Sequence, residues 1–230
     1  MLETLDLKGW TMTRSEPVVL PHGKPIPPSI RGFMWAAELM ELNRVAWLLK
    51  EQGIPGAVLE IGSYCGLSAA ALAQPGPLVC IDTFMDVWGP SENERYTRPE
   101  FDANMELMGL AKYDWRTLPS GEQERGAMIE PLVLECPSAS ALEWLRLCPP
   151  HPSRRFRLIL VDAGHSYKEA HRDIMDAEPL LSPGGVMVVD DADVADVNHA
   201  ISDSPFQGVS SPVGKLLFCM RKEELRPSLQ

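Results

Sequence analysis

The stretch VLEIGSYCGLSAAALA, residues 58–73, decides the fold class of this chain of 230 residues. It starts as a short apolar run, passes through a turn that contains Gly62 and Gly66, and continues as an alanine-rich segment. A continuous apolar run followed at once by a helical segment is typical of a buried strand in a parallel sheet. Glycine at such a turn lets the backbone bend sharply and approach a ligand closely.

Apolar runs and helical patterns alternate along the rest of the chain. Strands are expected in residues 57–61, 78–81, 132–134, 158–161, 186–189 and 216–220, and helices in residues 34–51, 67–73, 99–108, 140–147 and 165–181. Because parallel strands joined by helical crossovers form a sheet that is covered on both faces, the sequence predicts an α/β fold of the doubly wound, Rossmann-like type. Ligands bind such sheets at the carboxyl ends of the strands.

The composition is that of an ordinary globular protein, with 45% hydrophobic and 23% charged residues. The excess of 32 acidic over 21 basic residues disfavours nucleic acid as a partner. No apolar run is long enough for a membrane span, and the first residues do not resemble a secretory signal. Five scattered cysteines without a CxxC motif argue against a disulfide framework or a zinc ribbon, so we expect a cytoplasmic protein.

The chain divides into an N-terminal arm and one domain. Five prolines between residues 15 and 31 predict that residues 1–33 form an irregular arm or lid, and residues 34–230 are expected to form a single domain. The segments 85–130 and 202–213 are polar and mixed. Loops of this kind at the carboxyl edge of a sheet usually determine the choice of substrate.

The glycine turn reads G-x-x-x-G and therefore lacks both the dinucleotide fingerprint and the P-loop pattern. A purely structural turn remains open on the glycines alone. Glu60 lies in the strand before the turn, where a buried carboxylate needs a partner. Asp82 ends the next strand and could accept hydrogen bonds from both hydroxyls of a ribose. Together these residues favour a cofactor that contains a nucleoside but no pyrophosphate.

Acidic residues follow two further strands. Asp162 ends one strand, and Asp190 and Asp191 follow the next one, 28 and 29 residues later. Three carboxylates at one edge would raise one another's pKa values, and a divalent cation with oxygen ligands would relieve the repulsion. Asp162, Asp190 and Asp191 are therefore predicted to bind Mg²⁺, or another divalent cation such as Ca²⁺ or Mn²⁺. The alternative is that these acids are solvated loop residues.

The turn resembles motif I of class I S-adenosylmethionine (SAM)-dependent methyltransferases. It is most similar to the catechol O-methyltransferase type, whose turn reads E-x-G-x-Y-x-G-x-S. The matching residues are Glu60, Gly62, Tyr64, Gly66 and Ser68. The segments IDTF (81–84), LILVDAGHSY (158–167) and LLSPGGVMVVDDAD (180–193) extend the resemblance over residues 34–222, and they also resemble natural-product O-methyltransferases of the macrocin type. The resemblance implies a mostly parallel seven-stranded sheet with an antiparallel C-terminal strand.

The resemblance also implies a set of cofactor-binding residues. Gly62 and Tyr64 would contact the methionine end of SAM, and Ser68 its carboxylate. Asp82 would bind the ribose, and the adenine would lie near Phe84. The full set of predicted cofactor-binding residues is Glu60, Gly62, Ser63, Tyr64, Ser68, Asp82, Thr83, Phe84, Ser138 and Asp162.

His165 is the predicted general base. It follows Asp162 by three residues, which is the offset at which the catechol enzymes carry their catalytic lysine. A neutral imidazole can accept a hydroxyl proton near pH 7. The alternative is that His165 only caps or packs against the helix that follows.

The predicted function is Mg²⁺-dependent transfer of a methyl group from SAM to a hydroxyl of a small metabolite, such as a natural product, a sugar or a catechol-like ring. Two alternatives remain open. One is a metal-independent methyltransferase that acts on nitrogen or oxygen. The other is a catalytically silent protein that binds SAM or a nucleotide and acts through a partner. The resemblance also implies a homodimer or a larger homo-oligomer, and neither nucleic acid nor membrane is expected as a partner.

Overall fold

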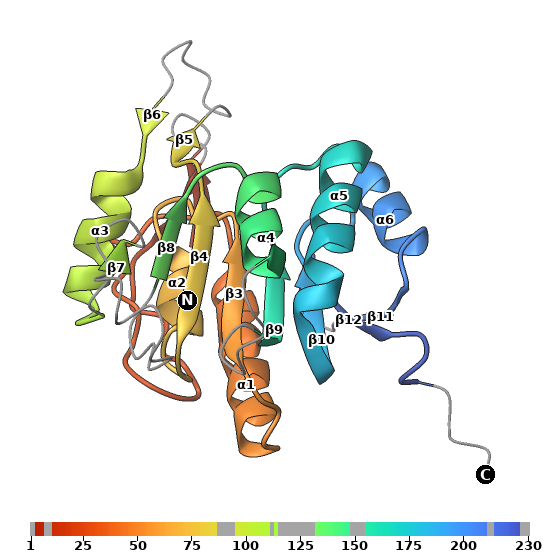
Figure 1. The fold of residues 1–230 in the computed structure, drawn as a ribbon. Helices are drawn as coiled ribbons and strands as arrows, with labels where there is room; N and C mark the ends of the chain where they lie inside the picture. Colours follow the sequence, from red (N-terminus) through yellow and green to blue (C-terminus); the bar gives the residue numbers. More distant parts are fainter. Residues whose placement is uncertain are drawn as a thin grey trace.

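The computed structural model describes residues 3–6, 11–86, 95–110, 113–114, 132–147, 155–210 and 214–225. Its centre is a twisted eight-stranded sheet with helices on both faces (Figure 1). In order across the sheet, the strands are β11 (Phe206–Ser210), β12 (Leu217–Arg221), β10 (Leu181–Val189), β9 (Phe156–Val161), β3 (Ala57–Ile61), β4 (Leu78–Asp82), β8 (Leu132–Glu135) and β7 (Tyr113–Asp114). The predicted α/β class is confirmed.

The pairing of the strands also follows the prediction. β10, β9, β3, β4, β8 and β7 pair in parallel, whereas β12 inserts between β10 and β11 and is antiparallel to both. The mostly parallel sheet with an antiparallel C-terminal strand is therefore confirmed. The two-residue edge strand β7 adds an eighth strand to the predicted seven.

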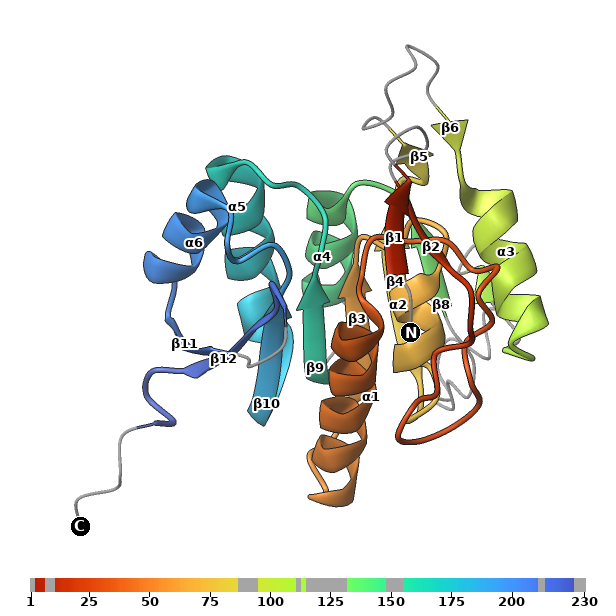
Figure 2. The ribbon, with the colours of Figure 1, turned by 180° about the vertical axis from the view of Figure 1, so that it is seen from behind.

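Two hydrophobic clusters hold the helices against opposite faces of the sheet. The helices are α1 (Ala36–Glu51), α2 (Leu67–Leu72), α3 (Arg98–Leu107), α4 (Ser138–Leu147), α5 (Tyr167–Ala177), continued by the short 3₁₀ helix η2 (Glu178–Leu180), and α6 (Ala195–Ser202). Alternate residues of the strands face opposite clusters, as Val58 and Leu59 do in β3. The first cluster packs β3 against α1, α2 and α3, and the second packs it against α4, α5 and α6 (Figures 1 and 2).

The N-terminal segment, predicted as an irregular arm, packs its apolar residues into the core. β1 (Glu3–Asp6) pairs with β2 (Thr11–Arg14), and Val18 and Ile26 form an isolated antiparallel bridge. Val18, Ile26 and Ile30 are fully buried in the cluster that also contains α1 and α2. The prolines interrupt regular structure, but the apolar residues between them still bury hydrophobic surface, and that burial fixes the segment.

The segment 202–213 also differs from the expected loop. Phe206–Ser210 forms β11, which pairs with β12, and α6 precedes it. The sequence gives little sign of this strand because Pro205 precedes it and Gly208 lies within it. Strand formation here depends on tertiary contacts such as the burial of Phe206. Much of the segment 85–130 lies outside the described residues, although β5 (Met85–Asp86) pairs with β6 (Arg95–Tyr96).

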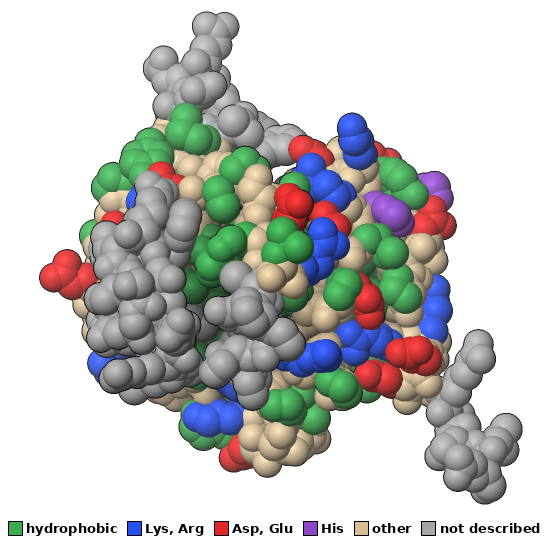
Figure 3. All heavy atoms as spheres, viewed as in Figure 1, with side chains coloured by type: hydrophobic (Ala, Val, Ile, Leu, Met, Phe, Trp, Pro, Cys, Tyr) green, Lys and Arg blue, Asp and Glu red, His purple; other side chains and the backbone are tan. Residues whose placement is uncertain are grey.

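The structure also bears on the expectations about membrane spans, thiols and surface charge. No helix in the described part of the chain is long and apolar enough to cross a membrane. Cys65, Cys80, Cys136 and Cys219 are free thiols, and Cys148 lies outside the described residues. On the described part of the face that Figure 3 shows, Lys and Arg side chains lie next to Asp and Glu side chains.

The carboxyl ends of four neighbouring strands meet at one edge of the sheet. The register pairs Ile61 with both Ile81 and Val161, and it pairs Val161 with Val189. The residues that end or follow these strands therefore lie side by side: Gly62, Asp82, Asp162 and Asp190. This juxtaposition is the one that the sequence predicted.

Candidate active site

The glycine turn is held closely against the neighbouring strand end. Gly62 has a φ of +94°, and its N–H donates to the carbonyl of Ile81 at 2.8 Å. A Cβ atom at this position would lie 1.8 Å from the carbonyl oxygen of Asp162. Because that obstacle is backbone, only glycine fits here. Gly66 also has a positive φ, and α2 begins directly after it.

Asp82 fastens the turn from the next strand. One of its carboxylate oxygens accepts from the backbone N–H groups of Ser63 and Tyr64, both at 2.7 Å. The other oxygen accepts from the N–H of Phe84 at 2.6 Å. Charge-assisted hydrogen bonds of this kind are strong. Asp82 therefore organises the turn itself, which is a role that the sequence did not predict, and its role in ribose binding stays a prediction.

Glu60 lies behind the turn and is not among the lining residues of the two cavities described below. Its side chain is fully buried in β3 and accepts a hydrogen bond from the hydroxyl of Ser63 at 2.5 Å. Burial raises the pKa of this carboxyl to about 7. The sequence predicted that the buried Glu60 needs a partner, and Ser63 of the turn is that partner. Glu60 therefore stabilises the turn through this hydrogen bond.

Among the residues that the structure describes, three other than glycine have backbone angles in the left-handed region, and all three line the same cavity. They are Tyr64, Phe84 and Asp191, with φ values of 47°, 56° and 52°. Such angles cost on the order of 1–3 kcal/mol each and are concentrated at functional sites. The surrounding contacts hold these residues in place, as the hydrogen bonds from Tyr64 and Phe84 to Asp82 show.

The cavity lies at the carboxyl edge of the sheet and has a volume of about 630 Å³. Pockets for small molecules usually have volumes of about 300–1,000 Å³. A second cavity of about 210 Å³ shares several of its lining residues and lies toward α4. Of the predicted site residues, the larger cavity is lined by Gly62, Ser63, Tyr64, Ser68, Asp82, Thr83, Phe84, Asp162, His165 and Asp191, and the smaller one by Gly62, Asp82, Thr83 and Ser138.

The side chains of Ser138 and Phe84 border the cavities but contact other side chains of the protein. Ser138 begins α4, and its hydroxyl donates to Asp173 at 2.7 Å at the wall of the smaller cavity. Phe84 is only 1% exposed, because its ring packs against Phe101 with the centroids 5.2 Å apart. Both residues border the cavities, but their side chains already have partners within the protein.

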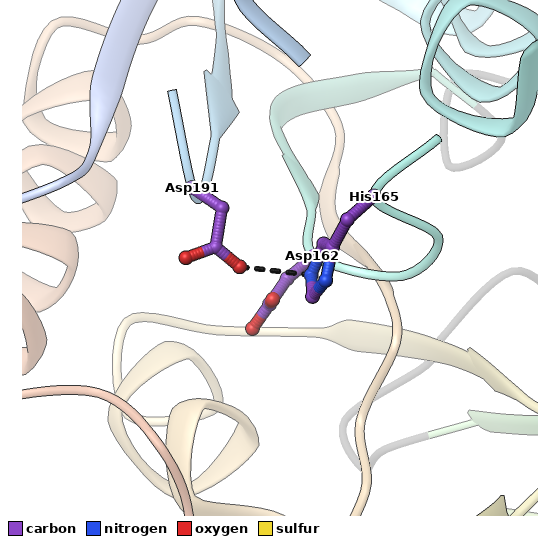
Figure 4. A group of neighbouring side chains, drawn as sticks. All are labelled: Asp162, His165 and Asp191. Carbon is purple, nitrogen blue, oxygen red and sulfur yellow. Dashed lines mark ion pairs between the residues drawn. The ribbon is translucent and has the colours of Figure 1, made fainter. Parts of the chain in front are cut away.

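The acidic residues of the site surround a lysine. The ammonium group of Lys215 lies 2.8 Å from Oδ2 of Asp190 and 2.7 Å from Oδ1 of Asp191. The other oxygen of Asp191, Oδ2, lies 2.8 Å from Nε2 of His165 (Figure 4). Asp162 completes the group from the end of β9 and lines the cavity. The structure therefore brings together the predicted acids and the predicted base, and it adds a cation that the sequence did not predict.

These contacts set the charges in the site. Burial favours the neutral form of Asp191, but hydrogen bonds from His165 and Lys215 outweigh it and lower the pKa of this carboxyl to about 2. The hydrogen bond to Asp191 raises the pKa of His165 above its ordinary value. Burial and the neighbouring Asp190 raise the pKa of Asp162 well above its ordinary range. Burial opposes the charge of Lys215, but attraction by Asp190 and Asp162 outweighs it and raises the pKa of the lysine.

His165 is not the cap of α5. The hydroxyl of Ser166 caps this helix by accepting from the N–H of Glu169 at 3.3 Å, and the helix begins at Tyr167. The imidazole of His165 instead points toward Asp191 at the cavity (Figure 4). A histidine that donates to a carboxylate in this way is oriented for proton transfer.

The predicted magnesium ligands are grouped only in part, and a lysine and a histidine already contact them. Ligand atoms of Asp162, His165 and Asp191 lie within 4.8 Å of one another, but Asp190 is not part of this group. Both oxygens of Asp191 already contact the cationic Lys215 or the imidazole. Mg²⁺ takes oxygen ligands at about 2.0–2.1 Å in a near-ideal octahedron. An ion bound by Asp191 would have to share these oxygens with Lys215 and His165.

The N-terminal segment contributes cavity residues that the sequence analysis missed. Arg31 lines the cavity and makes two hydrogen bonds of 2.7 Å to the carboxylate of Glu100. Phe33 lines it too, and its ring lies 5.4 Å from that of Tyr64. No local pattern marks these residues, because they reach the site only through the packing of the N-terminal segment.

Comparisons with known proteins agree with this geometry. A family described as "Methyltransferase domain" matches residues 59–192, which is more than half of the chain. The chain belongs to this methyltransferase family, and the predicted resemblance is confirmed. No curated protein sequence matches the chain significantly.

Solved structures with the same fold include three O-methyltransferases. TomG from Streptomyces achromogenes, involved in tomaymycin synthesis and solved with SAM, is 20% identical, with 82% of this chain and 81% of that chain covered and a TM-score of 0.53. CalS11, a TDP-rhamnose 3'-O-methyltransferase of calicheamicin biosynthesis, is 16% identical, with 80% and 78% covered and a TM-score of 0.54. An O-methyltransferase from Bacillus cereus, solved with S-adenosylhomocysteine (SAH), is 16% identical, with 79% and 80% covered and a TM-score of 0.52.

Proposed function

We propose that this methyltransferase transfers a methyl group from SAM to a hydroxyl group of a small metabolite. The observation that carries the proposal is the pair of His165 and Asp191, which lies at the cavity beside the glycine turn. A base in this position suits a hydroxyl, which must lose its proton when it is methylated. Structural neighbours that were solved with SAM or SAH support the choice of cofactor.

The cofactor would lie across the two cavities, which share several lining residues. Its methionine end would contact Gly62, Ser63, Tyr64 and Ser68 in the larger cavity. The ribose would lie over Asp82 and Thr83, which line both cavities, and the adenine would extend toward Phe84 and Ser138. Asp162 would border the methionine and the transferred methyl group.

His165 and Asp191 would handle the proton that the acceptor hydroxyl loses. Bound SAM would supply the methyl group from its positively charged sulfur. The sulfur would keep the electron pair of the broken carbon–sulfur bond. His165 takes the proton of the acceptor hydroxyl as the oxygen–carbon bond forms. In the neutral tautomer that donates from Nε2 to Asp191, Nδ1 is the basic nitrogen. Asp191 then stabilises the imidazolium, and the walls of the cavity align the acceptor with the methyl group.

Magnesium dependence stays a prediction. The acids that would hold the ion are present, but the contacts of Asp191 with Lys215 and His165 favour the metal-independent alternative. The choice of acceptor among natural products, sugars and catechol-like rings also stays a prediction. The partly exposed apolar side chains of Phe33 and Met85 at the cavity would suit an acceptor with an apolar face.

The reaction can be tested by mass spectrometry. The wild-type protein, incubated with SAM and extracts rich in small hydroxylated metabolites, is expected to convert SAM to SAH and to add one methyl group to an extract component. Deuterated SAM identifies the product, because the transferred group then carries three deuterium atoms. If the folded protein forms no labelled product and no SAH above the level without enzyme, the proposed function is wrong.

The Asp191→Asn variant is expected to lower the pKa of His165. The hydrogen bond to Asp191 is the main cause that raises this pKa, so the neutral base should exist at lower pH in the variant. The pH at which kcat/KM rises should shift down in the same way. NMR titration of the imidazole measures the pKa without an acceptor. Asp203→Asn, which alters the His199–Asp203 pair, is the matched control. An unchanged titration of His165 in Asp191→Asn contradicts the pairing.

A further inference from the structure

Lys215 reaches the acidic site from a segment that neither the family motifs nor the predicted ligands include. It lies just before β12, the strand that inserts between β10 and β11. Its ammonium group contacts one carboxylate oxygen of Asp190 and one of Asp191, at 2.8 and 2.7 Å. Asp190 is almost fully buried, and among the described residues Lys215 is its only ion-pair partner. Removal of this cation would leave the buried carboxylate of Asp190 without a neighbouring positive charge.

The backbone of Lys215 is fixed on both sides. Its N–H donates to Oε1 of Glu38 at 3.0 Å, and its carbonyl accepts from the N–H of Ala192 at 3.0 Å. Glu38 is fully buried in α1, and its other oxygen accepts from the N–H of Trp35 at 2.8 Å. These bonds tie the lysine to α1 and to the loop that carries Asp191. The position of the ammonium group is therefore part of the fold.

Gly214 makes this anchoring possible. It has a φ of +61°, and a Cβ atom there would lie 2.0 Å from Oε1 of Glu38. Any other residue before Lys215 would have to displace the Glu38 carboxylate that anchors the lysine, and would also adopt a left-handed conformation. A surface lysine that reached the acids by chance would need no such arrangement.

A divalent ion and the ammonium group would compete for the same oxygens. An ion bound by Asp191 would lie within a few ångströms of Lys215, and two like charges at that distance repel strongly inside a protein. Oδ2 of Asp191 already contacts His165 at 2.8 Å, so an ion there would have to share this oxygen with the imidazole. The fold already supplies a cation at the oxygens of Asp190 and Asp191.

We propose that the ammonium group of Lys215 is the built-in cation of this site and takes the place of a divalent metal ion. Lys215 holds Asp190 and Asp191 in position, and Asp191 in turn orients His165, so Lys215 is a positioning residue. The inference rests on the proposed function for the role of His165. The position of the cation itself is independent of that function. It follows that methyl transfer by this protein needs no divalent metal.

Binding of Mn²⁺, measured by electron paramagnetic resonance of the free ion, tests the proposal. The wild-type protein is expected not to bind Mn²⁺. Lys215→Met is expected to bind it more tightly than the wild type by more than about tenfold, because a like charge beside the ion has been removed. Lys215→Arg keeps the charge and should behave as the wild type. Lys222→Met is the matched control, since Lys222 donates to the carbonyl of Ser204 away from the acids.

Two outcomes would overturn the proposal. One is Mn²⁺ binding by the wild type that Asp191→Asn abolishes, because the acids would then hold a metal despite Lys215. This measurement does not depend on whether Lys215→Met folds. The other is a folded Lys215→Met variant that binds Mn²⁺ no better than the wild type. SAM titration of the same samples reports separately on the proposed function, because it does not depend on which cation the acids hold.

Discussion

Replacement of His165 with alanine is expected to lower kcat for methyl transfer by about 10²–10⁴-fold, which is the usual contribution of a general base. The imidazole lies at the cavity, paired with Asp191. Without it, the acceptor hydroxyl must lose its proton to water. The affinity for SAM should hardly change, because His165 is not among the predicted cofactor-binding residues. Turnover of SAM with the acceptor found by mass spectrometry measures the first effect, and calorimetry measures the second.

A second histidine provides the control for this variant. His171 lies on α5, where its ring stacks on Tyr167, and it does not line the cavity. His171→Ala should therefore keep the activity of the wild type. An active His165→Ala variant would mean that the imidazole does not take the proton. The pairing with Asp191 would then have only a structural role.

Replacement of Gly62 with alanine is expected to have the largest effect on the fold of the site. The added Cβ would meet the backbone of Asp162 at 1.8 Å, and the residue would be forced into a left-handed conformation. Strain and overpacking together should lower the free energy of unfolding by about 2–6 kcal/mol. The turn and the end of β9 must separate, so SAM binding should be lost. Chemical denaturation and calorimetry measure the two effects.

Gly53 separates the clash from the backbone strain. It has a φ of +74°, but a Cβ atom there would meet nothing within 4 Å. Gly53→Ala should therefore lower the free energy of unfolding only by the cost of the left-handed conformation, about 1–2 kcal/mol. It should bind SAM as the wild type does. If Gly62→Ala were no less stable than Gly53→Ala and still bound SAM, the close approach of the turn to Asp162 would be unimportant.

The sequence was sufficient to predict the sheet and the acidic edge. Apolar runs such as 158–161 are periodic signals, and parallel pairing brings their carboxyl ends to one edge whatever the loops do. Asp82, Asp162 and Asp190 could therefore be placed together before the structure was known. His165 was expected close to them as well, because it follows the end of β9 by only a few residues.

Other features depend on tertiary contacts that leave no local pattern. Lys215 reaches the acids because β12 inserts antiparallel between β10 and β11, and no spacing in the sequence reveals that insertion. Arg31 and Phe33 enter the cavity through the packing of an irregular segment. Glu60 was expected at the cofactor because a buried carboxylate needs a partner, but Ser63 within the turn supplies that partner.

The most direct test of the account is the titration of the folded wild-type protein with SAM in a buffer that contains EDTA. Binding of one SAM per chain is expected with the chelator present, because the site consists of the turn that begins at Gly62, Asp82 and the two cavities, without a metal ion. Binding of SAH at the same site should compete with it. A folded protein that binds neither SAM nor SAH would contradict the central claim that these cavities hold the methyl donor.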